Sequence, residues 1–236
     1  MRYFLLITSL LFSAQSIAGI SLSQAVVHFE DGGKRSADVV VFNQGNETVY
    51  VKIEPSIILN PGTDEQKREV YRDPKTAGLL VTPQRLVIPA GSRKRVRFVR
   101  MDDPATASKD KVFRVLVKPE VGAVQSEQTA VKIIVAYEVL VLSQPKNAQH
   151  KLQSDFDGKV LKISNKGNTN VLLQKGIQCP EGQDFEDEKN DCVELSGGRV
   201  YAGATWQTPL TYSTPVQYQI SVGLNNSLIV FQADKK

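Results

Sequence analysis

The side chains that most often carry out chemistry are scarce in this chain of 236 residues. It has two histidines, His28 and His150, and neither lies near a cluster of Asp, Glu or Cys at the spacing of metal ligands. The sequence also lacks the G-x-S-x-G turn of serine hydrolases and a glycine-rich phosphate loop. These observations argue against an enzyme, and we predict no metal and no cofactor.

The densest charge is the run RKRVRFVR, which begins at Arg93. In a strand, alternation places Arg93, Arg95 and Arg97 on one face, while Val96 and Phe98 point to the other. No aromatic side chains interleave as stacking platforms for bases, and 29 basic residues against 25 acidic residues leave a formal net charge of only +4. We therefore interpret the run as a solvated strand face over a core, and expect no nucleic-acid partner.

The first eighteen residues have the pattern of a secretory signal peptide. Arg2 is followed by an apolar run from Tyr3 to Phe12 and by a polar tail that ends with small residues at Ser16 and Ala18. A buried first strand or a membrane anchor is the alternative, but the apolar run is too short to cross about 30 Å of hydrocarbon. No later segment is apolar for long enough either, so residues 1–18 are predicted to be a signal peptide and no integral membrane segment is expected.

The two cysteines, Cys179 and Cys192, are thirteen positions apart with acidic and turn residues between them. In an exported protein such a pair predicts a disulfide. By the loop-entropy estimate it would contribute about 3 kcal/mol.

Period-two apolar patterns broken by Gly, Pro, Asn or Asp predict an all-β chain. The expected strands before residue 143 are Ser21–Val27, Ala37–Asn43, Val49–Ile58, Leu79–Val81, Leu86–Ile88, Arg95–Val99, Val112–Val117 and Val131–Leu142. After a polar elbow at Ser143–Lys151, a second series is expected at Val160–Ser164, Asn170–Gln178, Cys192–Leu195, Arg199–Tyr201, Tyr218–Val222 and Ser227–Phe231. We predict two immunoglobulin-like β-sandwich domains in tandem, at 19–145 and 146–236.

The segment Val131–Leu142 is apolar at both parities, whereas a strand with one wet face should alternate. One face can pack on the core of the sandwich, and the other needs a further partner because an exposed apolar strand promotes aggregation. That partner is either another part of the same protein, such as the second domain, or another polypeptide to which the strand is lent.

Several short motifs resemble, in this order and spacing, those of the periplasmic chaperones of the chaperone-usher pathway for pilus assembly. They are Ile20-Ser21-Leu22, Phe29-Glu30-Asp31-Gly32, Leu80-Val81-Thr82-Pro83, Ile88-Pro89-Ala90-Gly91, Val96-Arg97-Phe98, Phe113-Arg114-Val115 and Asn165-Lys166-Gly167-Asn168. Leu59-Asn60-Pro61-Gly62-Thr63 is similar to the alternate branch of the family, which serves colonization-factor-type pili.

The resemblance implies a periplasmic chaperone that lends a strand to an incomplete pilin sandwich and delivers the pilin to an outer-membrane usher. Strand donation of this kind is known from chaperone–pilin pairs. Counting back from Pro145, the side chains that face the guest become Val131, Ile133 and Val135. The resemblance leaves open whether two free copies cap each other's strands as a homodimer.

The resemblance also implies a basic anchor for the terminal carboxylate of the pilin. The two positions that are basic in the better-known branch align with Val26 and Leu140, which are apolar. Arg114 is the first candidate to replace them because it interrupts an apolar strand beside the donor strand, and Arg97 is the second. The alternative for Arg114 is that it points to solvent or pairs with Glu138.

A different class of function is an exported adhesin or a structural pilus protein. Such a protein would have to donate an N-terminal extension. Here the strand that is apolar on both faces lies before the elbow, and two complete series of strands are expected. The sequence therefore favours the chaperone.

Overall fold

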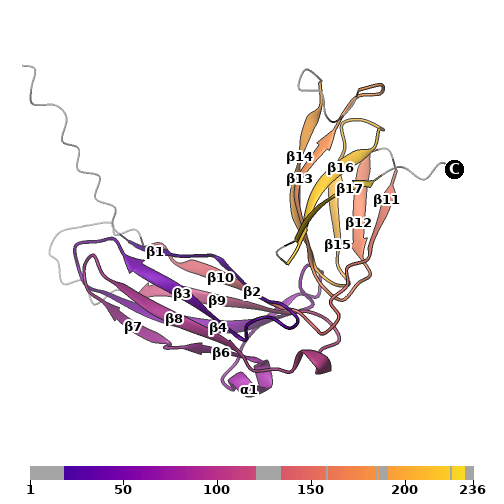
Figure 1. Cartoon of the computed structure of the whole chain (residues 1–236). Coiled ribbons are helices and arrows are strands. Elements are labelled where there is room, and N and C mark those ends of the chain that lie inside the picture. The colour runs from indigo at the N-terminus through magenta and orange to yellow at the C-terminus, as the bar shows by residue number, and fades with distance from the viewer. Residues whose placement is uncertain are drawn as a thin grey trace, which may run out of the picture.

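The computed structural model describes residues 19–120, 134–157, 159–183, 185, 191–223 and 225–231. The described residues form four β-sheets, two built from strands before residue 144 and two from strands after residue 151 (Figure 1). The all-β prediction with two sandwich domains in tandem is therefore confirmed. The two domains meet at an angle, so the molecule has the outline of a boomerang.

The first domain packs one sheet of order β1-β3-β8-β6 on another of order β2-β10-β9-β4-β5, with β7 also paired to β4. Phe29, Phe98 and Phe113 are fully buried in the core between these sheets. The strands are β1 (Ile20–Leu22), β2 (Val26–Phe29), β3 (Ser36–Asn43), β4 (Val49–Leu59), β5 (Lys67–Val70), β6 (Leu79–Thr82), β7 (Arg85–Ile88), β8 (Arg93–Arg100), β9 (Lys111–Glu120) and β10 (Tyr137–Ser143).

The second domain packs a sheet of order β11-β12-β15 on one of order β14-β13-β16-β17. Its core is centred on the fully buried Tyr218, whose ring meets Trp206 edge-on at a centroid distance of 5.7 Å. Gly176 lies against the same ring, where an added Cβ would be 2.5 Å from Tyr218 Cζ. The strands are β11 (Leu152–Phe156), β12 (Val160–Asn165), β13 (Val171–Gln178), β14 (Val193–Val200), β15 (Thr205–Pro209), β16 (Val216–Val222) and β17 (Asn225–Phe231).

The predicted first strand, Ser21–Val27, is wrong as a single element. The chain leaves one sheet after Ser23, whose backbone N–H donates to Val40 O at 2.9 Å, and joins the other sheet at Ala25, whose carbonyl accepts from Leu140 N at 2.9 Å. Apolar alternation continues through this crossing, so the pattern does not reveal it.

The other differences from the predicted elements are small. The strands β5, β11 and β15 are additional to the predicted ones, and the two segments predicted at Cys192–Leu195 and Arg199–Tyr201 belong to the single strand β14. Two short helices, α1 (Pro74–Ala77) and a 3-10 turn at Pro104–Thr106, are additional as well. Both follow an aspartate that caps the first turn, which is a local signal for such a turn.

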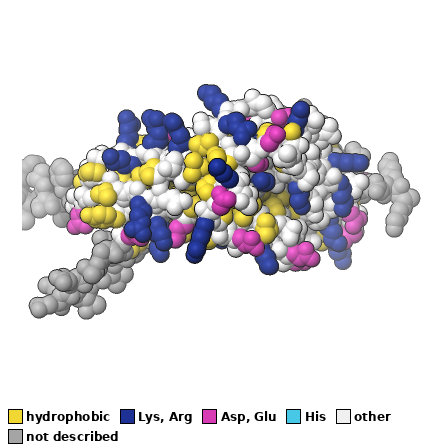
Figure 2. Space-filling model, turned by 90° about the horizontal axis from the view of Figure 1, so that it is seen from below, with side chains coloured by type: hydrophobic (Ala, Val, Ile, Leu, Met, Phe, Trp, Pro, Cys, Tyr) yellow, Lys and Arg dark blue, Asp and Glu magenta, His cyan; other side chains and the backbone are white. Residues whose placement is uncertain are grey.

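The surface seen from below in Figure 1 is mixed. Lys and Arg side chains project around much of this face, and hydrophobic side chains gather between them (Figure 2). In β8, Arg93, Arg95 and Arg97 are exposed, while Val96 and Phe98 are buried, as alternation predicts.

The junction between the domains is a polar network. Asp110 Oδ2 in the first domain accepts from the backbone N–H of Asn170 at 2.6 Å, from its side-chain amide at 2.5 Å, and from Thr169 Oγ1 at 3.2 Å. The buried Arg100 donates to Gln144 O at 2.5 Å, and the Gln144 side chain donates to Thr169 Oγ1 at 3.3 Å. These bonds fasten the start of the predicted elbow to both domains.

Candidate functional site

The strand β10 lies inside its sheet for only part of its length. It pairs antiparallel with β9 from Tyr137 to Ser143, but pairs with β2, in parallel, only from Leu140 onward. Among the described residues, no strand pairs with the β2 side of β10 before Leu140. Within the described part of the chain, the β2 side of β10 is therefore an open sheet edge before Leu140.

The two apolar faces of β10 have different neighbours. Val139 and Val141 point into the core of the first domain. Leu140 and Leu142 are buried on the other face, in a cluster with Ile58 and Val112 that Tyr201 of the second domain covers. The interpretation that the neighbouring domain covers the second face is thus confirmed for this end of the strand.

The residues predicted to face a guest lie before β10. Val131 and Ile133 fall outside the described residues. Val135 is described, with 52% of its surface exposed, and Ile134 beside it is 40% exposed. Residues 134–136 are not part of a strand, so the predicted strand Val131–Leu142 is observed as Tyr137–Ser143. The assignment of the guest-facing side chains stays a prediction.

A cavity of about 330 Å³ lies on the outer face of the same sheet, where the second domain approaches it. Its lining is both charged and apolar: Ile58, Pro61, Gln66, Arg68, Val112, Arg114, Glu138 and Tyr201. Tyr201 is the contribution of the second domain, and its ring also packs against Gly62. The close approach of Gly62 to that ring, together with a φ of +76° at Gly62, accounts for a glycine at this position.

Three charged side chains of this cavity form a chain across the sheet. Arg68 of β5 donates through Nε to Ser56 Oγ at 3.1 Å and through Nη2 to Glu138 Oε1. Arg114 of β9 places Nη1 at 3.9 Å from Glu138 Oε2, and about a third of each side chain is exposed. The pairing of Arg114 with Glu138, which the sequence leaves as an alternative, is therefore observed, but at the outer limit of an ion pair.

The other residues considered for the anchor lie as follows. Val26 and Leu140, the apolar residues at the two positions that are basic in the better-known branch, are register partners on β2 and β10. Arg97 lies on β8, in the other sheet, and donates to both carboxylate oxygens of Asp38 at 2.8 and 2.9 Å. This pair holds the pKa of Asp38 below its usual value. Arg97 contributes to a surface ion pair and does not line the cavity.

Arg199 of β14 is a charged residue near the site that sequence reasoning missed. It donates to the side-chain oxygen of Asn170. Burial lowers its pKa, although Tyr201 and the negative charge of Asp110 act in the opposite direction. Burial also raises the pKa of Asp110, which faces Arg199 across the junction, and lowers the pKa of His28. No local pattern in the sequence marks Arg199, because its partners belong to distant segments.

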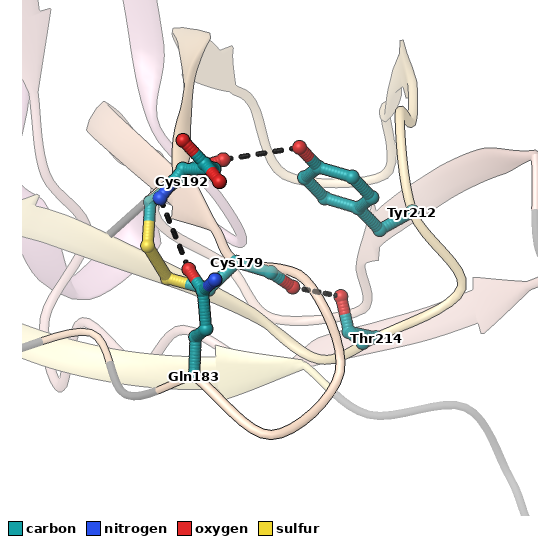
Figure 3. The surroundings of a disulfide bond; sticks show 6 residues. Cys179, Gln183, Cys192, Tyr212 and Thr214 are labelled. Carbon is teal, nitrogen blue, oxygen red and sulfur yellow. Dashed lines mark hydrogen bonds between the residues drawn. A yellow bond between two sulfur atoms is a disulfide. The ribbon is translucent and has the colours of Figure 1, made fainter.

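The predicted disulfide is confirmed. Cys179 and Cys192 are joined directly after the end of β13 (Figure 3), and neither lines the cavity. Hydrogen bonds hold the enclosed loop on both sides: Thr214 Oγ1 donates to Cys179 O at 2.5 Å, and Tyr212 Oη donates to Asp191 O at 3.0 Å. The disulfide is part of the scaffold of the second domain.

The described residues thus form two sandwiches, with an open stretch of strand edge and a charged cavity where they meet. The chain belongs to the family described as "Pili and flagellar-assembly chaperone, PapD N-terminal domain", whose sequence profile matches residues 19–149, more than half of the chain. The resemblance seen in the sequence motifs is thereby confirmed. Members of this family are chaperones and not enzymes.

One curated relative is a CS1 fimbrial protein of Escherichia coli, which is 26% identical over 182 residues that make up 75% of each chain. The structure of the class 5 fimbriae chaperone CfaA aligns with 90% of this chain and 98% of its own, with a TM-score of 0.64 and 22% identity. The Salmonella enterica SafA pilin in complex with the SafB chaperone gives a TM-score of 0.61 with 13% identity, over 93% of this chain and 98% of the matched one.

Membrane-spanning helices and metal clusters are both missing from the described part of the chain. No helix there is long and apolar enough to cross a membrane. No group of three or more His, Cys, Asp or Glu side chains there could hold a metal ion.

Proposed function

We propose that this chaperone binds pilins by donor-strand complementation and passes them to an outer-membrane usher. A pilin that lacks its last strand has an open apolar groove. The segment that ends in β10 fills the groove, gives main-chain hydrogen bonds along its open edge, and inserts alternate side chains. The observation that carries the proposal is the open edge of β10 before Leu140, with exposed Val135 and Ile134 directly before the strand.

Val131, Ile133 and Val135 are the guest-facing residues in this proposal. They have the same parity as Val139 and Val141, which fill the chaperone's own core. One row of side chains thus passes from the chaperone core into the core of the guest. Each buried apolar side chain in such a row contributes about 1.5–3 kcal/mol.

Arg114 is the proposed anchor for the terminal carboxylate of the pilin. It lines the cavity at the domain junction, on the strand next to β10, and the ion pair it makes within the chain is long. A charged hydrogen bond to the carboxylate is stronger than a neutral one and directs the end of the guest toward the cleft. Arg97 is the weaker candidate because its guanidinium already holds Asp38.

The proposed site of action is the periplasm. Residues 1–18 direct export to the periplasm and are removed, and the mature domains extend over 19–145 and 146–236. Free chaperone molecules cap each other's exposed strands as homodimers until a pilin arrives. The SafA–SafB complex supports a pilin as the guest, since its chaperone has the same fold as this chain.

The alternative is an exported adhesin or structural pilus subunit, and the CS1 relative is named as a fimbrial subunit. The family match favours the chaperone, because the matched profile is that of an assembly chaperone and extends over the donor segment.

The test is co-expression of the chaperone, as Val135→Asp, with a tagged pilin. An aspartate in an apolar groove is a charge without a partner, so we expect capture of the pilin to be lost while the chaperone stays folded. Val87→Asp is the matched control, because Val87 is 51% exposed and Val135 is 52% exposed, and Val87 lies on β7 away from the open edge.

Undiminished co-purification of the pilin with Val135→Asp would contradict the guest-facing assignment. Equal loss with both variants would show that capture depends on the general surface and not on the donor segment. A pilin that stays soluble and assembles without any chaperone would favour the structural alternative.

A further inference from the structure

The cavity beside Arg114 already contains a carboxylate of the chain itself. Arg68 reaches from β5 across the face of the sheet to Glu138 Oε1, and Arg114 faces Glu138 Oε2 from the neighbouring strand. Both oxygens of Glu138 are therefore directed at guanidinium groups. An external carboxylate that approached Arg114 would find the carboxylate of Glu138 already beside the guanidinium group.

The charges that line the cavity are two guanidinium groups and one carboxylate, so one positive charge is left over. A single monoanion neutralises it. The two pairs differ in strength, because Arg68 is in direct contact with Glu138 and is also held by Ser56 Oγ, whereas Arg114 is 3.9 Å away. Arg114 is thus the guanidinium that an incoming carboxylate can reach with the least rearrangement.

We propose that Glu138 is an internal competitor that sets which carboxylates the site accepts. A small free carboxylate has to displace Glu138 from Arg114 unaided. The terminal carboxylate of a strand that is already paired with the chaperone has an effective concentration on the order of millimolar or more. It therefore displaces Glu138 from Arg114. The site then selects chain ends delivered by a docked strand over free anions. This inference rests on the proposed anchor role of Arg114.

The experiment is a titration of the mature protein with N-acetylglycine, followed by NMR of the arginine Nε–H groups, with N-acetylglycinamide as the uncharged probe. Glu138→Gln removes the charge and keeps the shape. We expect it to bind N-acetylglycine about 1.5- to fivefold more tightly than the wild type, which corresponds to the loss of a partly exposed ion pair. Neither protein should respond to the amide.

Glu54→Gln is the matched control. Glu54 is in the same cross-strand row as Glu138, with Leu116 between them, and is similarly exposed, but its partner is Lys52 at 2.6 Å and it does not line the cavity. We expect it to leave the affinity for N-acetylglycine unchanged. The double variant Glu138→Gln/Arg114→Ala should lose the gain.

Equal or weaker binding by Glu138→Gln, or no saturable shift at all in this variant, would overturn the proposal. If Glu138→Gln/Arg114→Ala still bound N-acetylglycine more tightly than the wild type, the proposal would be overturned too, because a group other than Arg114 would then bind the carboxylate. No pilin is present in this titration, so its failure is separate from a failure of pilin capture by the donor strand.

Discussion

Replacing Arg114 with alanine separates its role in guest binding from its role in the fold. Its ion pair with Glu138 measures 3.9 Å between partly exposed side chains, and exposed pairs of this kind contribute about 0.2–1 kcal/mol. The free energy of unfolding should therefore change by less than about 1 kcal/mol. Loss of a charged hydrogen bond to the guest carboxylate should cost about 1.5–3 kcal/mol of binding free energy.

The expected loss of binding free energy corresponds to about a 10- to 150-fold weaker complex with the pilin. The assay is competition: a complex of a pilin with tagged Arg114→Ala chaperone is mixed with an equal amount of untagged wild type, and the pilin on each is measured at equilibrium. Most of the pilin should move to the wild type.

Arg97→Ala tests the weaker candidate for the anchor: it breaks two hydrogen bonds to Asp38 on the other sheet and should leave the pilin equally shared. An even distribution with Arg114→Ala would refute the anchor assignment. So would a large fall in its melting temperature, which would make Arg114 a structural residue.

Two further predictions concern the scaffold. Cys179→Ser/Cys192→Ser should lower the stability of the second domain by about 3 kcal/mol in thermal unfolding, with pilin capture unchanged, and equal melting curves would contradict the structural role of the disulfide. Asp110 has a pKa raised above its usual value by burial, so the folded protein binds this proton more tightly than the unfolded chain, and its contribution to stability falls as pH rises above the ordinary value of 3.8. The melting temperature of Asp110→Asn minus that of the wild type should therefore become more positive from about pH 4 to about pH 7, and a flat difference would contradict the raised pKa.

The sequence predicts most of what depends on neighbours along the chain. Alternation in β8 correctly assigns Arg95 to the surface and Phe98 to the core, and the spacing of the two cysteines predicts their disulfide. The prediction that Arg114 lies on a strand next to β10 is also correct, because β9 and β10 are long and strongly patterned.

The parts of the site that the sequence does not predict come from distant segments. Arg68 is 70 positions from Glu138, on a strand whose residues are all exposed and therefore have no alternation to detect. Tyr201 and Arg199 reach the junction from the second domain, and only the angle between the domains brings them there. A pattern of period two identifies a strand, but it does not identify which strand will lie beside it.

The open edge of β10 ends at Leu140, because β2 pairs with β10 in parallel from this residue onward. Leu140 N already donates to Ala25 O at 2.9 Å, so a guest strand that paired with β10 as proposed would be blocked at this residue by the chaperone's own chain. A shift of one residue would turn every side chain of the guest to the opposite face, and a blocked end prevents such a shift. Leu140 is also the register partner of Arg114, so the block lies level with the cavity. In the proposed complex, the end of the guest strand would therefore fix its register on β10, whatever the sequence of that strand.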